Sequence, residues 1–223
     1  GEPVIRQAMV QAMRILGRQF VMGRTIGEAL ERAREGESHG SRFSFDMLGE
    51  AARTSSDAER YFDTYSKAIA AISRARGTRT MVSGPGISVK LSALHPRFEE
   101  ARREQVLREL APRLHALAMA ACRGGIGLTV DAEEAERLEL TLDLVEAVYS
   151  DTEAFAGWEG FGLAVQAYQK RALPVLHWLE ELAGRHQRRL MLRLVKGAYW
   201  DSEIKRAQER GLEGYPVFTR KVN

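Results

Sequence analysis

The sequence predicts an α/β protein of the (β/α)8 TIM-barrel type, containing only the first four strand-helix units, preceded by an all-helical amino-terminal region. Two observations predict this class. Short apolar segments alternate with segments of helix length, which indicates a parallel sheet. In each apolar segment, residues of one parity are large and apolar and those of the other parity are smaller or polar, so the two sets point to opposite faces of a strand. The four segments begin near Ile87, Ile126, Phe161 and Leu190.

This alternation favours a barrel over an open doubly wound sheet. In a barrel the outward residues meet the helices and the inward residues line the interior. An open sheet covered on both faces should instead show near-continuous apolar runs.

Residues 1–78 are predicted to be a helical arm. Apolar residues recur at helical spacing over about residues 4–16, and a second helix is expected from Ile26 to Arg34. A third helix is expected to begin at Ser56, which forms a capping box with Glu59. Residues 79–85 then form a linker, and residues 86–223 form the first half of the barrel.

The predicted barrel helices fill the intervals between the strands. Pro112 is expected to kink or divide the first of them. Because a closed barrel needs about eight strands, four strands imply half a barrel with unpaired edges. We therefore expect the sequence to be part of a longer protein. The helices are expected at Arg102–Cys122, Glu133–Tyr149, Gln169–Ala183 and Ser202–Arg210.

Composition argues against several classes of function. The 33 basic and 30 acidic residues leave a formal charge of only +3, which is too small an excess to indicate nucleic-acid binding. Cys122 is the only cysteine, so an internal disulfide is excluded and a reducing compartment is favoured. With no signal peptide and no long apolar run, we expect a cytoplasmic protein. The histidines lack metal-ligand spacing, and no metal site is expected.

The polar face of each predicted strand supplies one functional group near the strand's carboxyl end, namely Lys90, Asp131, Gln166 and Arg193. A lysine within an apolar strand is rarely buried unless it is paired. An ion pair between Lys90 and Asp131 is therefore expected, either as a structural pair or directed at a charged substrate. Asp131 is also a candidate helix cap. The acidic residues that follow it are expected to form a solvated first helical turn (Glu133, Glu134, Glu136).

The stretch "RLVKGAYW" places two cations before a turn. Arg193 and Lys196 have the character of groups that bind an anion or a polarised ring, and Gly197 and Ala198 allow the backbone to approach a ligand closely. Aromatic side chains here serve either as pocket walls or as core residues (Tyr199, Trp200). Gln166 either contacts a ligand or ties down a loop. The basic run of Arg185, Arg188 and Arg189 is expected to be a solvated loop.

Several motifs resemble the proline dehydrogenase domain of bacterial proline utilization A proteins, and the resemblance covers essentially the whole chain. The motifs are "GISVKLSALHPR", "DAEEAERLE", "RLVKGAYWDSEIKRAQ" and "EGYPVFTRK". The resemblance implies an FAD-dependent enzyme that oxidises L-proline to Δ1-pyrroline-5-carboxylate, with hydride transfer to flavin N5 and electrons passed to membrane quinone. It also implies peripheral contact with the membrane, a remaining barrel half, an aldehyde dehydrogenase module in the full-length chain and a possible homo-oligomer.

The resemblance also assigns roles to residues. Lys90, Asp131 and Tyr199 would lie at the substrate. The flavin-contacting positions would be Gln166, Arg193, Val195, Lys196, Gly197, Ala198, Trp200, Thr219 and Lys221. A cation near flavin N5 and N1 would stabilise the negative charge that reduction brings.

Two other functions remain open on the residues alone. One is a Schiff-base aldolase that uses Lys90 as the nucleophile and Asp131 as a proton shuttle. The other is a non-catalytic helical or basic binding module, which would show steeply salt-dependent nucleic-acid binding.

Overall fold

The computed structural model describes residues 5–7, 9–10, 13, 17 and 21–220. It divides into two compact units, Gly1–Phe43 and Ser44–Asn223. In the first unit, helix α2 (Ile26–Ser38) begins where the Thr25 side chain accepts a hydrogen bond from the backbone of Glu28. The helix predicted over residues 4–16 lies mostly outside the described residues.

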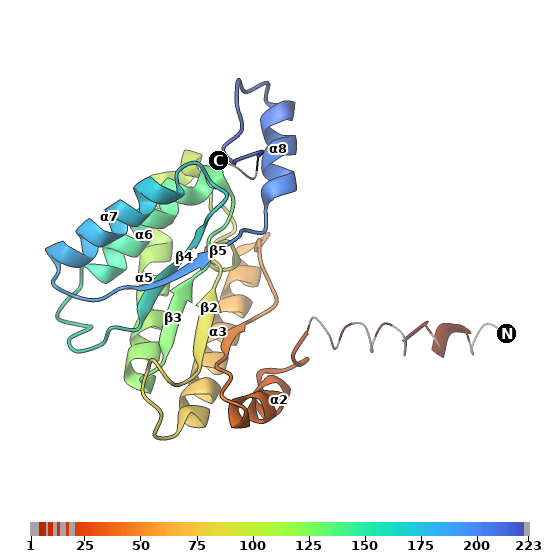
Figure 1. Ribbon diagram of the computed structural model, residues 1–223, viewed down its shortest axis with the longest axis vertical. Helices are drawn as coiled ribbons and strands as arrows, with labels where there is room; N and C mark the ends of the chain where they lie inside the picture. The colour runs from red at the N-terminus through yellow and green to blue at the C-terminus, as the bar shows by residue number, and fades with distance from the viewer. Residues whose placement is uncertain (1–4, 8, 11–12, 14–16, 18–20, 221–223) are drawn as a thin grey trace. The chain divides into compact units, whose positions relative to one another are not determined.

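The second unit is built on a five-stranded, wholly parallel sheet in which the strands lie in chain order (Figure 1). Helices α3, α5 and α7 pack against β2, β3 and β4, and α5 also packs against α3 and α6. This arrangement is what the first part of a barrel requires, and the closed barrel itself stays a prediction. The strands are β1 (Ser44–Asp46), β2 (Gly86–Val89), β3 (Gly127–Val130), β4 (Phe161–Gln166) and β5 (Met191–Val195).

Strand β1 lies within the region that the sequence predicted to be all helical, and that prediction was wrong. Phe45 is buried, whereas Ser44 and Asp46 are exposed, and all three residues pair with β2, so that Asp46 lies beside Ser88. A strand of three residues is too short to show a period in the sequence. The sheet therefore has five strands rather than four, and residues 79–85 lie inside the second unit.

The predicted strand faces are correct where the sheet is covered. Ile87, Val89, Leu128 and Val130 are fully buried on the helix side. In β5 the same face is exposed, and Leu192 and Leu194 are 49% and 58% accessible.

The predicted helices are present with shifted ends. Helix α3 is capped by Thr54 and Asp57 rather than by Ser56 and Glu59, because its first residue is Ser55. Helix α5 continues through Pro112 without dividing. The helical elements are α3 (Ser55–Arg76), α4 (Leu91–Leu94), η1 (Glu100–Arg102), α5 (Arg103–Gly124), η2 (Ala135–Arg137), α6 (Leu138–Tyr149), α7 (Ala172–Arg185) and α8 (Trp200–Glu209).

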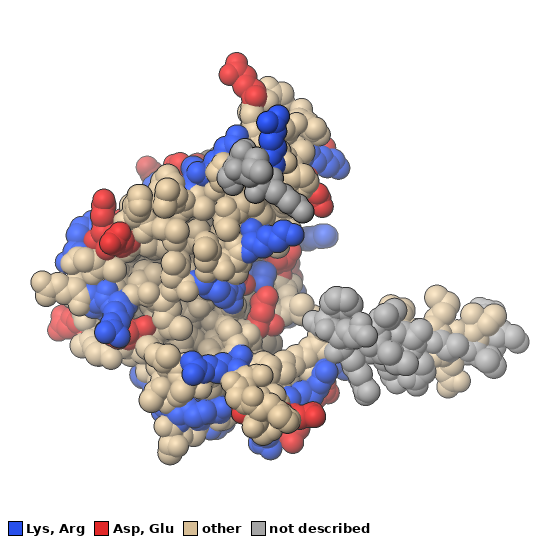
Figure 2. All heavy atoms as spheres, in the orientation of Figure 1, with Lys and Arg blue, Asp and Glu red and all other residues tan. Residues whose placement is uncertain are grey.

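Charged side chains of both signs are interspersed over the face shown in Figure 2. Arg188, which was predicted to be a solvated loop residue, instead holds two turns together. Its guanidinium donates to the backbone oxygens of Tyr149 at 2.8 Å and Trp158 at 3.1 Å, and it lies over the Tyr149 ring. Among the described residues no helix is long and apolar enough to cross a membrane.

Candidate active site

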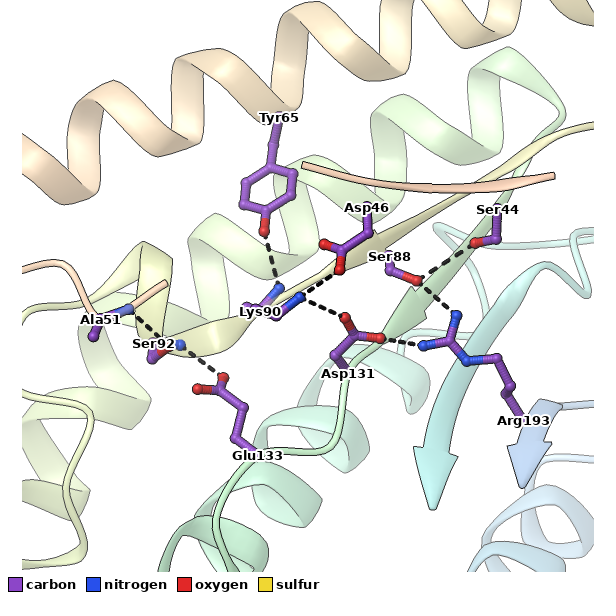
Figure 3. Close-up of polar contacts among 10 residues, drawn as sticks. All are labelled: Ser44, Asp46, Ala51, Tyr65, Ser88, Lys90, Ser92, Asp131, Glu133 and Arg193. Atoms are coloured by element: carbon purple, nitrogen blue, oxygen red, sulfur yellow. Dashed lines mark hydrogen bonds and ion pairs between the residues drawn. The ribbon is translucent and has the colours of Figure 1, made fainter. Parts of the chain in front are cut away.

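Two cations and two carboxylates meet at the carboxyl ends of the strands (Figure 3). Lys90, which follows β2, donates through Nζ to Asp46 Oδ2 at 2.7 Å and to Asp131 Oδ2 at 3.0 Å. Arg193 of β5 binds the other oxygen of Asp131. We call Asp46, Lys90, Asp131 and Arg193 the charge cluster. Strand parity predicted that Lys90 and Arg193 lie on one face of the sheet, and they do.

Hydroxyl groups extend the charge cluster along the sheet. Arg193 Nη1 donates to Ser88 Oγ at 2.9 Å, and Ser88 Oγ lies 3.4 Å from Ser44 Oγ. Ser44 and Asp46 point the same way from β1 because they are two residues apart. These hydrogen bonds thus connect β1, β2 and β5 on the polar face of the sheet.

Charge balance explains how this cluster can lie partly buried. The side chains of Lys90 and Asp131 are only 15% and 10% exposed, which would be costly for an unpaired ion. Burial lowers the pKa of Lys90, but the hydrogen bond to Asp46 and the charges of Asp131 and Asp46 outweigh it and raise the pKa overall. Lys90 is therefore a fixed cation.

Asp131 does not cap the helix that follows it, contrary to one expectation. The next helical turn, η2, begins after Glu134, and no side chain caps it. Both carboxylate oxygens of Asp131 are taken by the cations of the charge cluster. Its role is therefore within the site.

Tyr65 of α3 fixes the end of β2 from the helix layer. Its hydroxyl accepts a hydrogen bond of 3.1 Å from the backbone N–H of Lys90, at the point where the strand turns into α4. The side chain is 1% exposed, and burial raises its pKa, so the hydroxyl stays protonated. Nothing in the sequence pattern distinguished Tyr65 from the other apolar-face residues of the helix.

Glu133 is buried, and the prediction that it belongs to a solvated first turn was wrong. Its Oε1 accepts from the backbone of Ser92 at 3.0 Å, and its Oε2 pairs with Arg137 at 3.1 Å. Burial raises its pKa. Ser92 Oγ in turn accepts from the backbone of Ala51 at 3.1 Å. Glu133 and Ser92 therefore link the loops that follow β1, β2 and β3.

Gln166 ties loops together at the end of β4, which is one of the two roles that the sequence left open. It is 2% exposed. Its Nε2 donates to the backbone oxygen of Glu133 at 2.8 Å, and its Oε1 accepts from Tyr168 Oη at 2.6 Å and from the backbone of Ala198 at 3.1 Å.

The turn after β5 is shaped by close packing. Gly197 has φ +119°, and a Cβ there would lie 1.8 Å from Cε1 of Tyr168. Tyr168 Oη also accepts from the backbone of Tyr199 at 2.8 Å. Lys196 and Ala198 are exposed and Val195 is partly buried, and Lys196 makes no ion pair with the charge cluster.

The remaining predicted positions flank α8. Tyr199 is partly buried just before the helix, and burial raises the pKa of its hydroxyl. Trp200 is 40% exposed, and its ring N–H donates to the backbone oxygen of Phe218 at 2.9 Å. Thr219 is exposed, and Lys221 lies outside the described residues.

Two further acidic residues, Asp46 and Glu203, were not predicted from the sequence to have a role at the site. Asp46 was missed because β1 was not expected, and the polar-apolar-polar order of Ser44, Phe45 and Asp46 is too short a pattern to predict a strand by itself. Glu203 of α8 is 3% exposed and accepts from the backbone of Ala135 at 2.6 Å, so it fixes α8 to the start of η2. Among the described residues no group of three His, Cys, Asp or Glu side chains is placed to hold a metal ion.

Comparison with known proteins places this chain in a family. The chain is 57% identical over 222 residues to the bifunctional protein PutA of Salmonella typhimurium, an alignment that covers 100% of this chain and 17% of the relative. It is 28% identical over 196 residues to proline dehydrogenase 1 of Bacillus subtilis, which covers 87% of this chain and 56% of the relative. The chain therefore spans about a sixth of the PutA relative.

Solved structures agree. The D779Y mutant of proline utilization A from Bradyrhizobium japonicum superimposes with a TM-score of 0.84 at 56% identity, over 99% of this chain and 22% of that one. Proline utilization A from Bdellovibrio bacteriovorus, inactivated by N-propargylglycine, gives 0.91 at 25% identity, over 98% and 24%. The family profile described as Proline dehydrogenase matches residues 29–223. The chain belongs to the proline dehydrogenase family.

Proposed function

We propose that this chain supplies part of the active site of an FAD-dependent enzyme that oxidises L-proline to Δ1-pyrroline-5-carboxylate. The observation that carries the proposal is the charge cluster at the carboxyl ends of the strands, where active sites of strand-helix folds lie, in a chain of the proline dehydrogenase family. Electrons would pass to membrane quinone, in a cytoplasmic protein that contacts the membrane peripherally.

The residues present fit a flavin. Arg193 Nε is a buried donor without a hydrogen-bond partner among the described residues, and its guanidinium carries a charge fixed by Asp131. FAD, when bound, supplies an acceptor for hydride at N5. The residues that would hold it are Gln166, Arg193, Val195, Lys196, Gly197, Ala198, Trp200, Thr219 and Lys221.

Substrate binding falls to the other side of the charge cluster. Lys90 has three N–H donors, of which Asp46 and Asp131 take two. The third is left for the carboxylate of proline. Tyr199, whose hydroxyl stays protonated, would form one wall of the pocket. Asp131, which binds both Lys90 and Arg193, would hold the cation that meets the substrate and the cation that meets the flavin at a fixed separation.

The pairing of Lys90 argues against the aldolase alternative. A Schiff-base lysine must be neutral to attack a carbonyl, and such lysines have lowered pKa values. Here two carboxylates raise the pKa of Lys90, so the free amine is disfavoured. The near balance of 33 basic and 30 acidic residues likewise does not favour a basic binding module, and charges of both signs are interspersed on the face shown in Figure 2.

The visible spectrum of the full-length protein tests this function. We expect a yellow protein whose flavin band bleaches when proline is added without oxygen. Arg193→Met should lower the FAD content, whereas Arg189→Met should not, because Arg189 is 86% exposed, lies beside Glu159 and precedes the first residue of β5. A colourless protein, or a flavin band that proline leaves unchanged, would contradict the proposal.

A further inference from the structure

We propose that Asp46 is a positioning residue that holds Lys90 as a protonated, oriented donor for the carboxylate of the substrate. The inference rests on the proposed function and deepens it. It assigns a role in substrate binding to the short strand β1.

Strand geometry places Asp46 where this role requires. Phe45 is buried on the helix side of β1, so its neighbours Ser44 and Asp46 point to the opposite face. Pairing sets Asp46 beside Ser88, two residues before Lys90. The carboxylate therefore reaches Lys90 Nζ at 2.7 Å, a shorter contact than the 3.0 Å to Asp131.

The division of charge makes Asp46 necessary. Asp131 gives one oxygen to Lys90 and the other to Arg193, so its single negative charge serves two cations. Among the described residues, Asp46 forms an ion pair with Lys90 alone. Asp46 thus brings the charge cluster to neutrality and supplies the carboxylate that Lys90 does not share.

The other groups near Lys90 cannot replace this carboxylate. Tyr65 from α3 is a neutral hydroxyl that binds the backbone of Lys90. Tyr199, before α8, is also neutral because burial raises its pKa. Arg193 from β5 is a second cation, which acts against protonation of Lys90. Without the Asp46 charge, Lys90 would be paired only with Asp131, whose negative charge it shares with Arg193.

Asp46→Asn in the full-length protein removes the negative charge of the side chain and keeps its size and shape nearly unchanged. The probe is cyclopentanecarboxylate, a ring carboxylate that lacks the titrating amine of proline, and its dissociation constant is measured by calorimetry from pH 7 to pH 10. In the unmodified protein we expect constant affinity over this range. In Asp46→Asn the pKa of Lys90 should fall, and affinity should drop about tenfold for each pH unit above that new pKa.

Matched variants isolate the effect. Asp63→Asn removes an exposed aspartate of α3 and should leave the pH dependence unchanged. Asp46→Glu restores a carboxylate and should return the pH dependence toward that of the unmodified protein, and a pH-dependent loss in this variant would overturn the inference. So would an Asp46→Asn variant that loses affinity equally at every pH, since that result indicates a purely structural role.

The same experiment distinguishes this inference from the proposed function. A protein that binds cyclopentanecarboxylate with the expected pH dependence but shows no bleaching with proline would refute proline oxidation and leave the role of Asp46 intact. Bleaching with proline together with a flat pH profile in Asp46→Asn would refute the role of Asp46 alone.

Discussion

Gly197 is restricted to glycine by two separate constraints. Its φ of +119° is a conformation that other residues rarely adopt, and a Cβ would overlap the ring of Tyr168. Displacing Tyr168 would also break its hydrogen bonds with Gln166 and with the backbone of Tyr199. Gly197→Ala should therefore lower the free energy of unfolding by about 2–5 kcal/mol and reduce the FAD content of the purified protein.

Gly184→Ala provides the control for this prediction. Gly184 lies in α7 with open space where a methyl group would stand, since no atom lies within 4 Å of an added Cβ. Alanine there should be neutral or stabilise the helix by up to about 1 kcal/mol. Both variants are compared by chemical denaturation and by absorbance of bound flavin. Equal stability of the two would show that the turn after β5 is not constrained as described.

The sequence predicted the site residues that lie in the four longer strands or directly after them, and it missed those fixed by tertiary contacts. Lys90, Asp131 and Arg193 could be placed on one face because strand parity is a local property. Tyr65 and Glu133 could not, because each is defined by a contact with a distant part of the chain: Tyr65 with Lys90 and Glu133 with Ser92.

At the level of helices, the structure moves the start of α3 and offers a direct test. Thr54 Oγ1 accepts from the backbone of Asp57, and the Asp57 carboxylate accepts from the backbone of Thr54. Thr54→Ala should cost about 1 kcal/mol of stability. Ser56→Ala should cost much less, because Ser56 is an exposed residue within the helix. Denaturation of the two variants checks this, and a greater loss in Ser56→Ala would favour the cap predicted from sequence.

Sequence patterns located elements in proportion to their length. The four longer strands and the helices between them showed clear periodicity, whereas β1 has only three residues. Its existence depends on pairing with β2, which is a long-range interaction. Because β1 was not predicted, Asp46 at its end was not recognised as a site residue.

For the whole molecule, the barrel prediction can be tested at the edge of the sheet. Among the residues that the structure describes, β1 pairs with β2 only. In a closed barrel its other edge would pair with the last strand. In the full-length protein we therefore expect the peptide containing residues 44–46 to resist amide hydrogen exchange as strongly as the peptide containing β3. Rapid exchange at β1 beside slow exchange at β3 would indicate an open sheet.

One carboxylate, Asp131, stands between the two cations that would meet the substrate and the flavin. A ligand that weakens the ion pair between Lys90 and Asp131 should strengthen the ion pair between Arg193 and Asp131. A ligand that weakens the Arg193 pair should likewise strengthen the Lys90 pair. Binding of the substrate should therefore change the affinity for the flavin, and binding of the flavin the affinity for the substrate, without any movement of the backbone. For the same reason, the effects of replacing Lys90 and Arg193 together should differ from the sum of the two single effects.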